Sequence, residues 1–177
     1  RAHGGALAAI DHLLPATIGT LMIASGAPTR YGYSWGSHEH TDHLWSSDRL
    51  RVVHHGASMS RVDKLRAIAG ERLVHQHLRV CWENRAEEGN CSRCDKCVCT
   101  MVTIAACADP SQFVTFDWST PVERGLNRLR WTAFVRTYGE LLALPLPPSV
   151  RGAAEALLRR SAIAGRLRTL WHSWRGG

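Results

Sequence analysis

The chain has 177 residues, of which 45% are hydrophobic, and a formal net charge of +7 at neutral pH. This length is typical of one domain, or of one domain with an appendage, and the hydrophobic content excludes a chain that is disordered throughout. No run of about 18 apolar residues is present, so the sequence predicts no transmembrane helix.

The first residue is Arg1, and the sequence runs from it directly into a helical pattern that stops at Pro15. We therefore expect the chain to be a fragment of a longer protein. Lys64 and Lys96 are the only lysines among the 22 basic residues, and such an arginine bias is typical of a GC-rich bacterial genome. No signal peptide opens the chain, and thiols at metal-binding spacing favour a reducing cytoplasm.

The next part of the chain predicts strands that alternate with helices. Apolar runs at residues 20–24 and 50–54 predict two strands, with a loop rich in Gly, Pro, Ser and aromatic residues between them. Ser60 is a favourable helix N-cap, and it predicts a helix that Gly70 ends. Residues 74–82 alternate between apolar and polar, which predicts a third strand that carries Cys81 at its end.

The last part of the chain is predicted to be helical. A helix is expected from residue 95 to about residue 108, a second over residues 122–143 and a third over residues 153–174, with a proline-rich linker before the last. This order of elements predicts an α/β fold, as the second half of a parallel sheet. We place the α/β domain at residues 1–110 and a helical extension at residues 111–177.

Four cysteines form the most informative motif. Cys81, Cys91, Cys94 and Cys97 have the spacing C-x9-C-x2-C-x2-C. Two residues between cysteines allow a tight turn to direct both sulfur atoms at one ion, and four thiolates form a closed tetrahedral zinc site. The spacing favours structural zinc over an iron–sulfur cluster or disulfides. Cys99 and Cys107 are expected to be small buried residues.

A polar loop follows the first predicted strand, and it contains the sequence Gly36-Ser-His-Glu-His-Thr-Asp-His43. Ligands bind open α/β sheets in such positions, so Ser37, His38 and Asp42 are candidate substrate-binding residues. A second metal site in this loop is the alternative, and a solvated loop is another. Ser60 and Lys64 are candidate phosphate contacts at a helix start, where an ordinary N-cap and a surface lysine are the alternative.

The end of the chain is strongly basic. Residues 151–177 contain six arginines and one glutamate. These arginines predict either contact with RNA phosphates or a solvated helix face whose apolar side packs on the core. A helix that lies on a membrane surface is a third interpretation.

The cysteine run resembles the zinc knuckle of the 7-cyano-7-deazaguanine synthases. In that family a cysteine at a strand end precedes a short loop and a C-G-x-C-x-x-C turn that leads into a helix, as Cys81 and the run from Cys91 to Cys97 do here. Residues Ser60-Arg-Val-Asp-Lys64 resemble the family's helix start with its Ser-Lys pair. The resemblance covers about residues 15–108.

The resemblance implies a Rossmann-like fold of the PP-loop ATP pyrophosphatase superfamily, here its C-terminal half, with a structural zinc ion. It also implies ligase chemistry, in which ATP adenylates a carboxylate and ammonia then displaces AMP. The superfamily's S-G-G-x-D-S phosphate loop is absent from this sequence. The expected partners are a small-molecule or nucleotide substrate and further copies of the chain. The alternative function is a non-catalytic RNA-binding or scaffold module.

Overall fold

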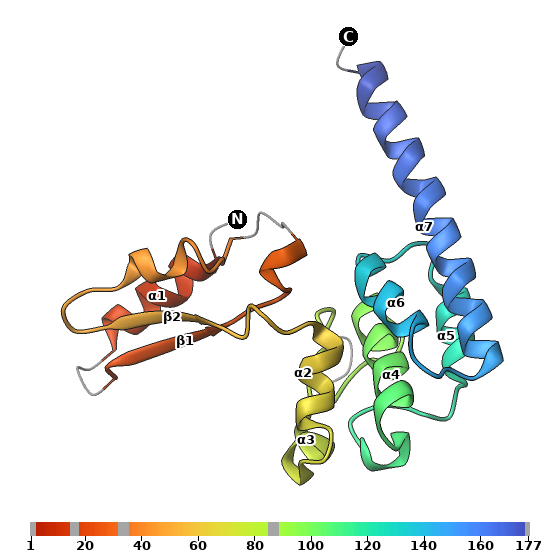
Figure 1. Cartoon of the computed structure of the whole chain (residues 1–177), viewed down its shortest axis with the longest axis horizontal. Helices are drawn as coiled ribbons and strands as arrows, with labels where there is room; N and C mark the ends of the chain where they lie inside the picture. The colour runs from red at the N-terminus through yellow and green to blue at the C-terminus, as the bar shows by residue number, and fades with distance from the viewer. Residues whose placement is uncertain (1–2, 15–17, 32–35, 85–88, 176–177) are drawn as a thin grey trace. The chain divides into compact units, whose positions relative to one another are not determined.

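The computed structural model describes residues 3–14, 18–31, 36–84 and 89–175, and for residues 166–175 it describes the backbone alone. The predicted stop at Pro15 lies outside these ranges. The elements are α1 (His3–Leu13), β1 (Thr20–Ala24), η1 (Thr29–Tyr31), η2 (Asp42–Trp45), β2 (Arg51–His55), α2 (Arg61–Ile68), α3 (Arg72–His77), α4 (Asp95–Cys107), η3 (Pro110–Gln112), α5 (Val122–Arg128), α6 (Val135–Leu142) and α7 (Pro148–Arg175) (Figure 1). None of the described helices is both long enough and apolar enough to cross a membrane.

The chain divides into two compact units, residues 1–63 and residues 64–177. This division differs from the boundary at residue 110 that we predicted. The reason is packing, because Phe113 and Phe116 are buried against α4 together with Cys97 and Met101. The segment after residue 110 therefore belongs to the same core as the cysteines.

The first unit contains a two-stranded parallel sheet. Strands β1 and β2 pair so that Thr20 lies opposite Arg51 and Ala24 lies opposite His55. Helix α1 packs against β1, and η2 packs against β2. Both predicted strands and the mixed α/β class are confirmed, whereas a wider Rossmann-like sheet stays a prediction.

Helix α2 begins as the sequence predicts. Ser60 Oγ accepts a hydrogen bond from the backbone N–H of Asp63 at 3.1 Å, and the Asp63 carboxylate accepts one from the Ser60 N–H at 3.1 Å. This reciprocal pair is a capping box, which satisfies backbone donors that a helix start otherwise leaves unpaired. The prediction of Ser60 as the N-cap is confirmed.

The second unit is built around α4. Every residue from Cys97 to Ile104 is buried, because α5 and α6 pack against α4 while its start lies at the cysteine cluster. Helix α7 packs against α5 and α6, as Figure 1 shows. The predicted helix after residue 95 is confirmed.

The predicted strand at residues 74–82 is wrong. Residues Arg72–His77 form helix α3, and an irregular segment then leads to Cys81. Val74 in α3 and Leu78, the residue that ends it, both pack on the core cluster. Their spacing of four is the helical spacing that brings two side chains to the same side. The apparent alternation of this segment hid that helical spacing.

The single helix predicted over residues 122–143 is also wrong. It is divided into α5 and α6, and the backbone between them is held by side chains of other helices. The N–H of Thr132 donates to Ser161 Oγ at 2.9 Å, and the N–H of Ala133 donates to the Asp95 carboxylate at 2.8 Å. These bonds replace the ones that a continuous helix would make.

Helix α7 begins at Pro148, five residues before the predicted start at residue 153. Proline is favoured in the first turn of a helix because its missing N–H has no helical partner there. The proline-rich linker is correspondingly shorter than predicted.

Two arginines of α7 hold the ends of the shorter helices. The Arg151 guanidinium donates to the carbonyls of Leu142 and Leu144 at 2.7 and 2.8 Å, at the end of α6. Arg160 donates to the carbonyls of Leu126 and Leu129 at 2.9 and 3.1 Å, at the end of α5. A cation is favourable at the negative end of a helix and supplies donors to its last carbonyls.

We predict that Arg160→Ala lowers the free energy of unfolding by about 1.5–3 kcal/mol, because hydrogen bonds to a charged group are lost. The matched control is Arg159→Ala on the same helix. Arg159 is exposed, and its ion pair with Glu155 spans 4.0 Å, so a change below about 1 kcal/mol is expected. Urea unfolding followed by circular dichroism measures both variants, and equal losses would contradict the capping role.

Candidate metal centre

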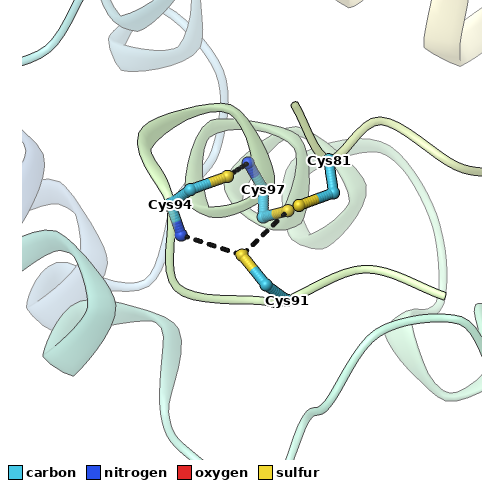
Figure 2. Close-up of side chains that lie close together, drawn as sticks. All are labelled: Cys81, Cys91, Cys94 and Cys97. Carbon is cyan, nitrogen blue, oxygen red and sulfur yellow. Dashed lines mark hydrogen bonds between the residues drawn. The ribbon is translucent and has the colours of Figure 1, made fainter. Parts of the chain in front are cut away.

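Four sulfur atoms converge at the start of α4. The Sγ atoms of Cys81, Cys91, Cys94 and Cys97 all lie within 4.8 Å of one another. Figure 2 shows them directed at one point, from the irregular segment, the turn and the first turn of the helix. No other group of three or more metal-ligating side chains gathers in this way in the part of the chain that the structure describes.

The separations fit a tetrahedral zinc ion. Zn–S bonds of about 2.3 Å at tetrahedral angles require sulfur atoms about 3.8 Å apart. Cys91 Sγ lies 3.8 Å from Cys97 Sγ. A disulfide needs about 2.05 Å, and none of the six cysteines, all of which the structure describes, is in a disulfide. The four residues therefore fit a zinc site, and the coarser prediction of a metal-binding cysteine cluster is supported.

Backbone N–H groups surround the sulfur atoms. The N–H of Cys94 points at Cys91 Sγ with an N···S distance of 3.4 Å, and the N–H of Cys97 points at Cys94 Sγ at 3.5 Å. Such donors favour the thiolate form, which is the form that binds metal. The C-x2-C spacing produces these contacts because it places the second N–H over the first sulfur.

The thiol pKa values favour the binding of a cation. Burial raises the pKa of Cys81, but hydrogen bonds from Cys91, Glu83 and Asn84 outweigh it and lower the pKa to about 6. Burial, reinforced by the neighbouring Cys91 sulfur, raises the pKa of Cys94. One thiolate is therefore favoured in the cluster, but several together are not. A bound divalent ion would favour the thiolate over the thiol at every ligand.

Asn90 joins the two arms of the cluster. Its Oδ1 accepts from the N–H groups of Val80 and Cys81 at 2.8 and 3.1 Å. Its Nδ2 donates to the Leu78 carbonyl at 2.8 Å and to Thr115 Oγ1 at 3.1 Å. The side chain is buried with its hydrogen-bonding capacity filled, so it fixes Cys81 relative to Cys91.

The turn before Asn90 depends on a glycine. Gly89 has a φ of +73°, and a Cβ there would lie 2.9 Å from the Thr115 carbonyl oxygen. Only glycine tolerates both this conformation and this approach of the backbone. The Asn90 N–H then donates to the same carbonyl at 2.9 Å, which aligns the turn for Cys91.

The structure also places the other predicted site residues. Ser37 and Asp42 are bonded to each other at 2.6 Å in the first unit, and the N–H of His38 donates to Asp42 at 3.1 Å. Ser60 is occupied by its capping box, and Lys64 is half-buried one turn later in α2. The ligand contacts of these residues stay predictions.

Sequence reasoning missed two residues. Asn90 lies directly before Cys91, and an amide beside a metal ligand was the only signal for it. The other is His54, which lies near the end of β2 and whose Nδ1 is 2.7 Å from the Asp42 carboxylate. The side chains of Arg166, Arg168 and Arg175 lie outside the described part of α7.

No family model, curated protein or solved structure matches this chain.

We predict about one zinc ion per chain, with four thiols protected from titration until a chelator is added. Cys91→Ser should lower zinc content and destabilise the second unit, because a ligand is lost from a closed site. Cys107→Ser, at the end of α4 and outside the cluster, should retain full zinc content. Elemental analysis with thiol titration measures both, and a Cys91→Ser variant that keeps its zinc would contradict the assignment.

We predict that Asn90→Ala lowers the free energy of unfolding by about 2–4 kcal/mol, because buried N–H and carbonyl groups lose their partners. Zinc affinity should fall roughly 10- to 100-fold, as is usual when a residue that orients metal ligands is removed. Asn127→Ala, at an exposed position of α5, is the control and should leave both quantities unchanged. Competition with a chromophoric chelator measures the affinity.

Proposed function

We propose that this chain is the zinc-containing part of an ATP-dependent, adenylating C–N ligase related to the 7-cyano-7-deazaguanine synthases. The observation that carries the proposal is the convergence of Cys81, Cys91, Cys94 and Cys97, in the order of that family's zinc knuckle. The parallel pairing of β1 and β2 supports it, because a Rossmann-like fold is built from parallel strands.

In this proposal the zinc ion has a structural role. Four cysteine ligands leave no coordination position for water or a substrate, so the ion supplies cross-linking and no acid–base chemistry. It would hold Cys81 and the start of α4 together. Since Met101 and Phe113 pack in the same core cluster as the cysteines, the metal would also stabilise the rest of the second unit.

The proposed reaction has two steps. A substrate carboxylate attacks the α-phosphorus of ATP, which forms an acyl adenylate and releases pyrophosphate. Ammonia then attacks the acyl carbon, so that a C–N bond forms, the C–O bond to AMP breaks and a proton is released. The substrate class is a small carboxylic acid, for which His38 is a candidate contact.

The described residues do not fit a nucleotide phosphate loop. β1 is followed by Ser25-Gly26-Ala27-Pro28 and then by the three-residue helix Thr29–Tyr31, which is too short to present a set of N–H groups to phosphates. The Ser60 hydroxyl is held by its capping box. The proposed use of ATP therefore rests on the resemblance of the cysteine motif.

A second candidate function, RNA binding, is favoured by an aromatic and basic surface beside the cysteines. Trp82 is 52% exposed, its ring stacks on Phe134 with centroids 5.7 Å apart, and Lys96 Nζ lies 6.0 Å from the Trp82 ring. Exposed aromatic rings near basic groups bind single-stranded RNA by base stacking. Arg151 and Arg160 bind carbonyls of this chain, which weakens the case for RNA contact through α7.

The test is ATP turnover by the zinc-loaded protein, expressed from its full gene so that any phosphate loop is included, with magnesium, ammonium and a panel of heteroaromatic carboxylic acids. We expect AMP and pyrophosphate in equal amounts only when an acid is accepted, as measured by chromatography of the nucleotides. Cys107→Ser should match the unmodified chain, and Cys94→Ser should lose zinc and turnover together.

The absence of AMP with every acid would contradict the ligase proposal. In that case, salt-dependent binding of single-stranded RNA that Trp82→Ala weakens would favour the second candidate.

A further inference from the structure

The first unit contains a buried carboxylate with three donors around it. Asp42 is fully buried, and its Oδ1 accepts from the His38 N–H at 3.1 Å. Its Oδ2 lies 2.6 Å from Ser37 Oγ and 2.7 Å from His54 Nδ1. Burial raises the pKa of Asp42, but hydrogen bonds from Ser37, His54 and His38 outweigh it, so the pKa is lowered and the group is ionised at neutral pH.

Helix α1 adds to this stabilisation. Gly4 lies in its first turn, and a Cβ at Gly4 would lie 2.6 Å from Asp42 Oδ1, so only glycine allows the helix start to approach the carboxylate. The Gly4 N–H donates to the Gly36 carbonyl at 2.8 Å, which holds the loop against the helix. The positive end of a helix favours a nearby anion.

His54 is held with one ring nitrogen directed at Asp42. The hydrogen bond to the carboxylate assigns the proton to Nδ1 and leaves a lone pair on Nε2. Only 7% of the side chain is exposed. No hydrogen bond to Nε2 is made by any residue in the described part of the chain. A ring nitrogen with a lone pair, in a side chain that is largely but not fully buried, is suited to accept a proton from a bound ligand.

The position of His54 in the sheet favours a ligand site. It is the fourth of the five residues of β2, opposite Ile23 of β1, and both strands end one residue later. Ligands of parallel α/β sheets bind at these carboxyl ends. The His38 ring is 6.4 Å from that of His54, and its Nδ1 accepts from the His40 N–H at 3.2 Å. Neutral His38 therefore carries its proton on Nε2 and offers a donor near the His54 acceptor.

We propose that His54 is the catalytic base of this protein and that Asp42 and Ser37 are positioning residues rather than substrate contacts. The identity of the proton donor rests on the proposed function, in which ammonia attacks an acyl adenylate. As the nitrogen lone pair forms the C–N bond and the C–O bond to AMP breaks, one N–H proton moves to His54 Nε2. The Asp42 carboxylate stabilises the imidazolium that forms.

The same bonds would also exist if His54 only attached the loop to β2, and two variants separate these roles. Asn at position 54 retains an N–H at the place of Nδ1 and lacks Nε2, so His54→Asn should keep the contact with Asp42. Gln places its amide near the former Nε2, so His54→Gln should lose that contact. Asp42→Asn presents an N–H to His54 and should move the ring proton to Nε2.

The first measurement is ethoxycarbonylation by diethyl pyrocarbonate, located by peptide mass spectrometry on the folded chain. We expect His54 to react, and to react at least 10-fold more slowly in Asp42→Asn, where Nε2 carries the proton. His40, whose side chain is 76% exposed, is the internal control and should react equally in both. A folded chain in which His40 reacts and His54 does not would overturn the proposal.

The second measurement is the rate of AMP formation. His54→Asn should lower kcat by about 10²- to 10⁴-fold while the melting temperature is unchanged, as expected for loss of a general base. Unchanged turnover in His54→Asn would overturn the role of His54 and leave the ligase proposal intact. If the unmodified chain makes no AMP, the ligase proposal fails, and the labelling experiment alone decides whether His54 has a reactive Nε2.

Discussion

Four thiol groups confined within 4.8 Å of one another cannot all ionise without a cation. Burial and the neighbouring sulfur raise the pKa of Cys94, while backbone N–H groups lower that of Cys81. A divalent ion would resolve this conflict, because it would stabilise each thiolate and join a turn, a helix start and an irregular segment at one point. We therefore expect the order of the second unit to depend on that interaction.

The rest of the second unit extends from the cluster. Cys97 begins the buried run of α4, and α5 and α6 pack on that helix. Arg151 of α7 binds carbonyls at the end of α6, and Arg160 of α7 binds carbonyls at the end of α5. Asn90 makes the corresponding link on the other side, between Leu78, Cys81 and Thr115. Loss of metal should therefore disturb more than the loop that holds it.

Local signals in the sequence identified the features that depend on neighbouring residues. The cysteine spacing predicted the cluster, Ser60 and Asp63 predicted the start of α2, and apolar runs predicted β1 and β2. Features that depend on distant contacts were not predictable. Nothing near Asn90 reveals its bond to Thr115, and the division between α5 and α6 follows from bonds to Asp95 and Ser161.

His54 illustrates the same limit at the candidate site of the first unit. A histidine near the end of a strand is common, so the sequence alone does not single out His54. The structure does, because the fold places Asp42 Oδ2 2.7 Å from His54 Nδ1. The loop residues Ser37, His38 and Asp42 were identified as candidate contacts from composition and position. The proposed roles, with Asp42 as the carboxylate that orients the ring and His54 as the base, required the geometry.

X-ray absorption spectroscopy of the purified chain would identify both the metal at the cysteine cluster and its ligands. We predict a zinc edge and four sulfur neighbours at about 2.3 Å, with no nitrogen or oxygen in the first coordination shell. An iron edge, or zinc with an oxygen or nitrogen ligand, would contradict a closed four-cysteine site.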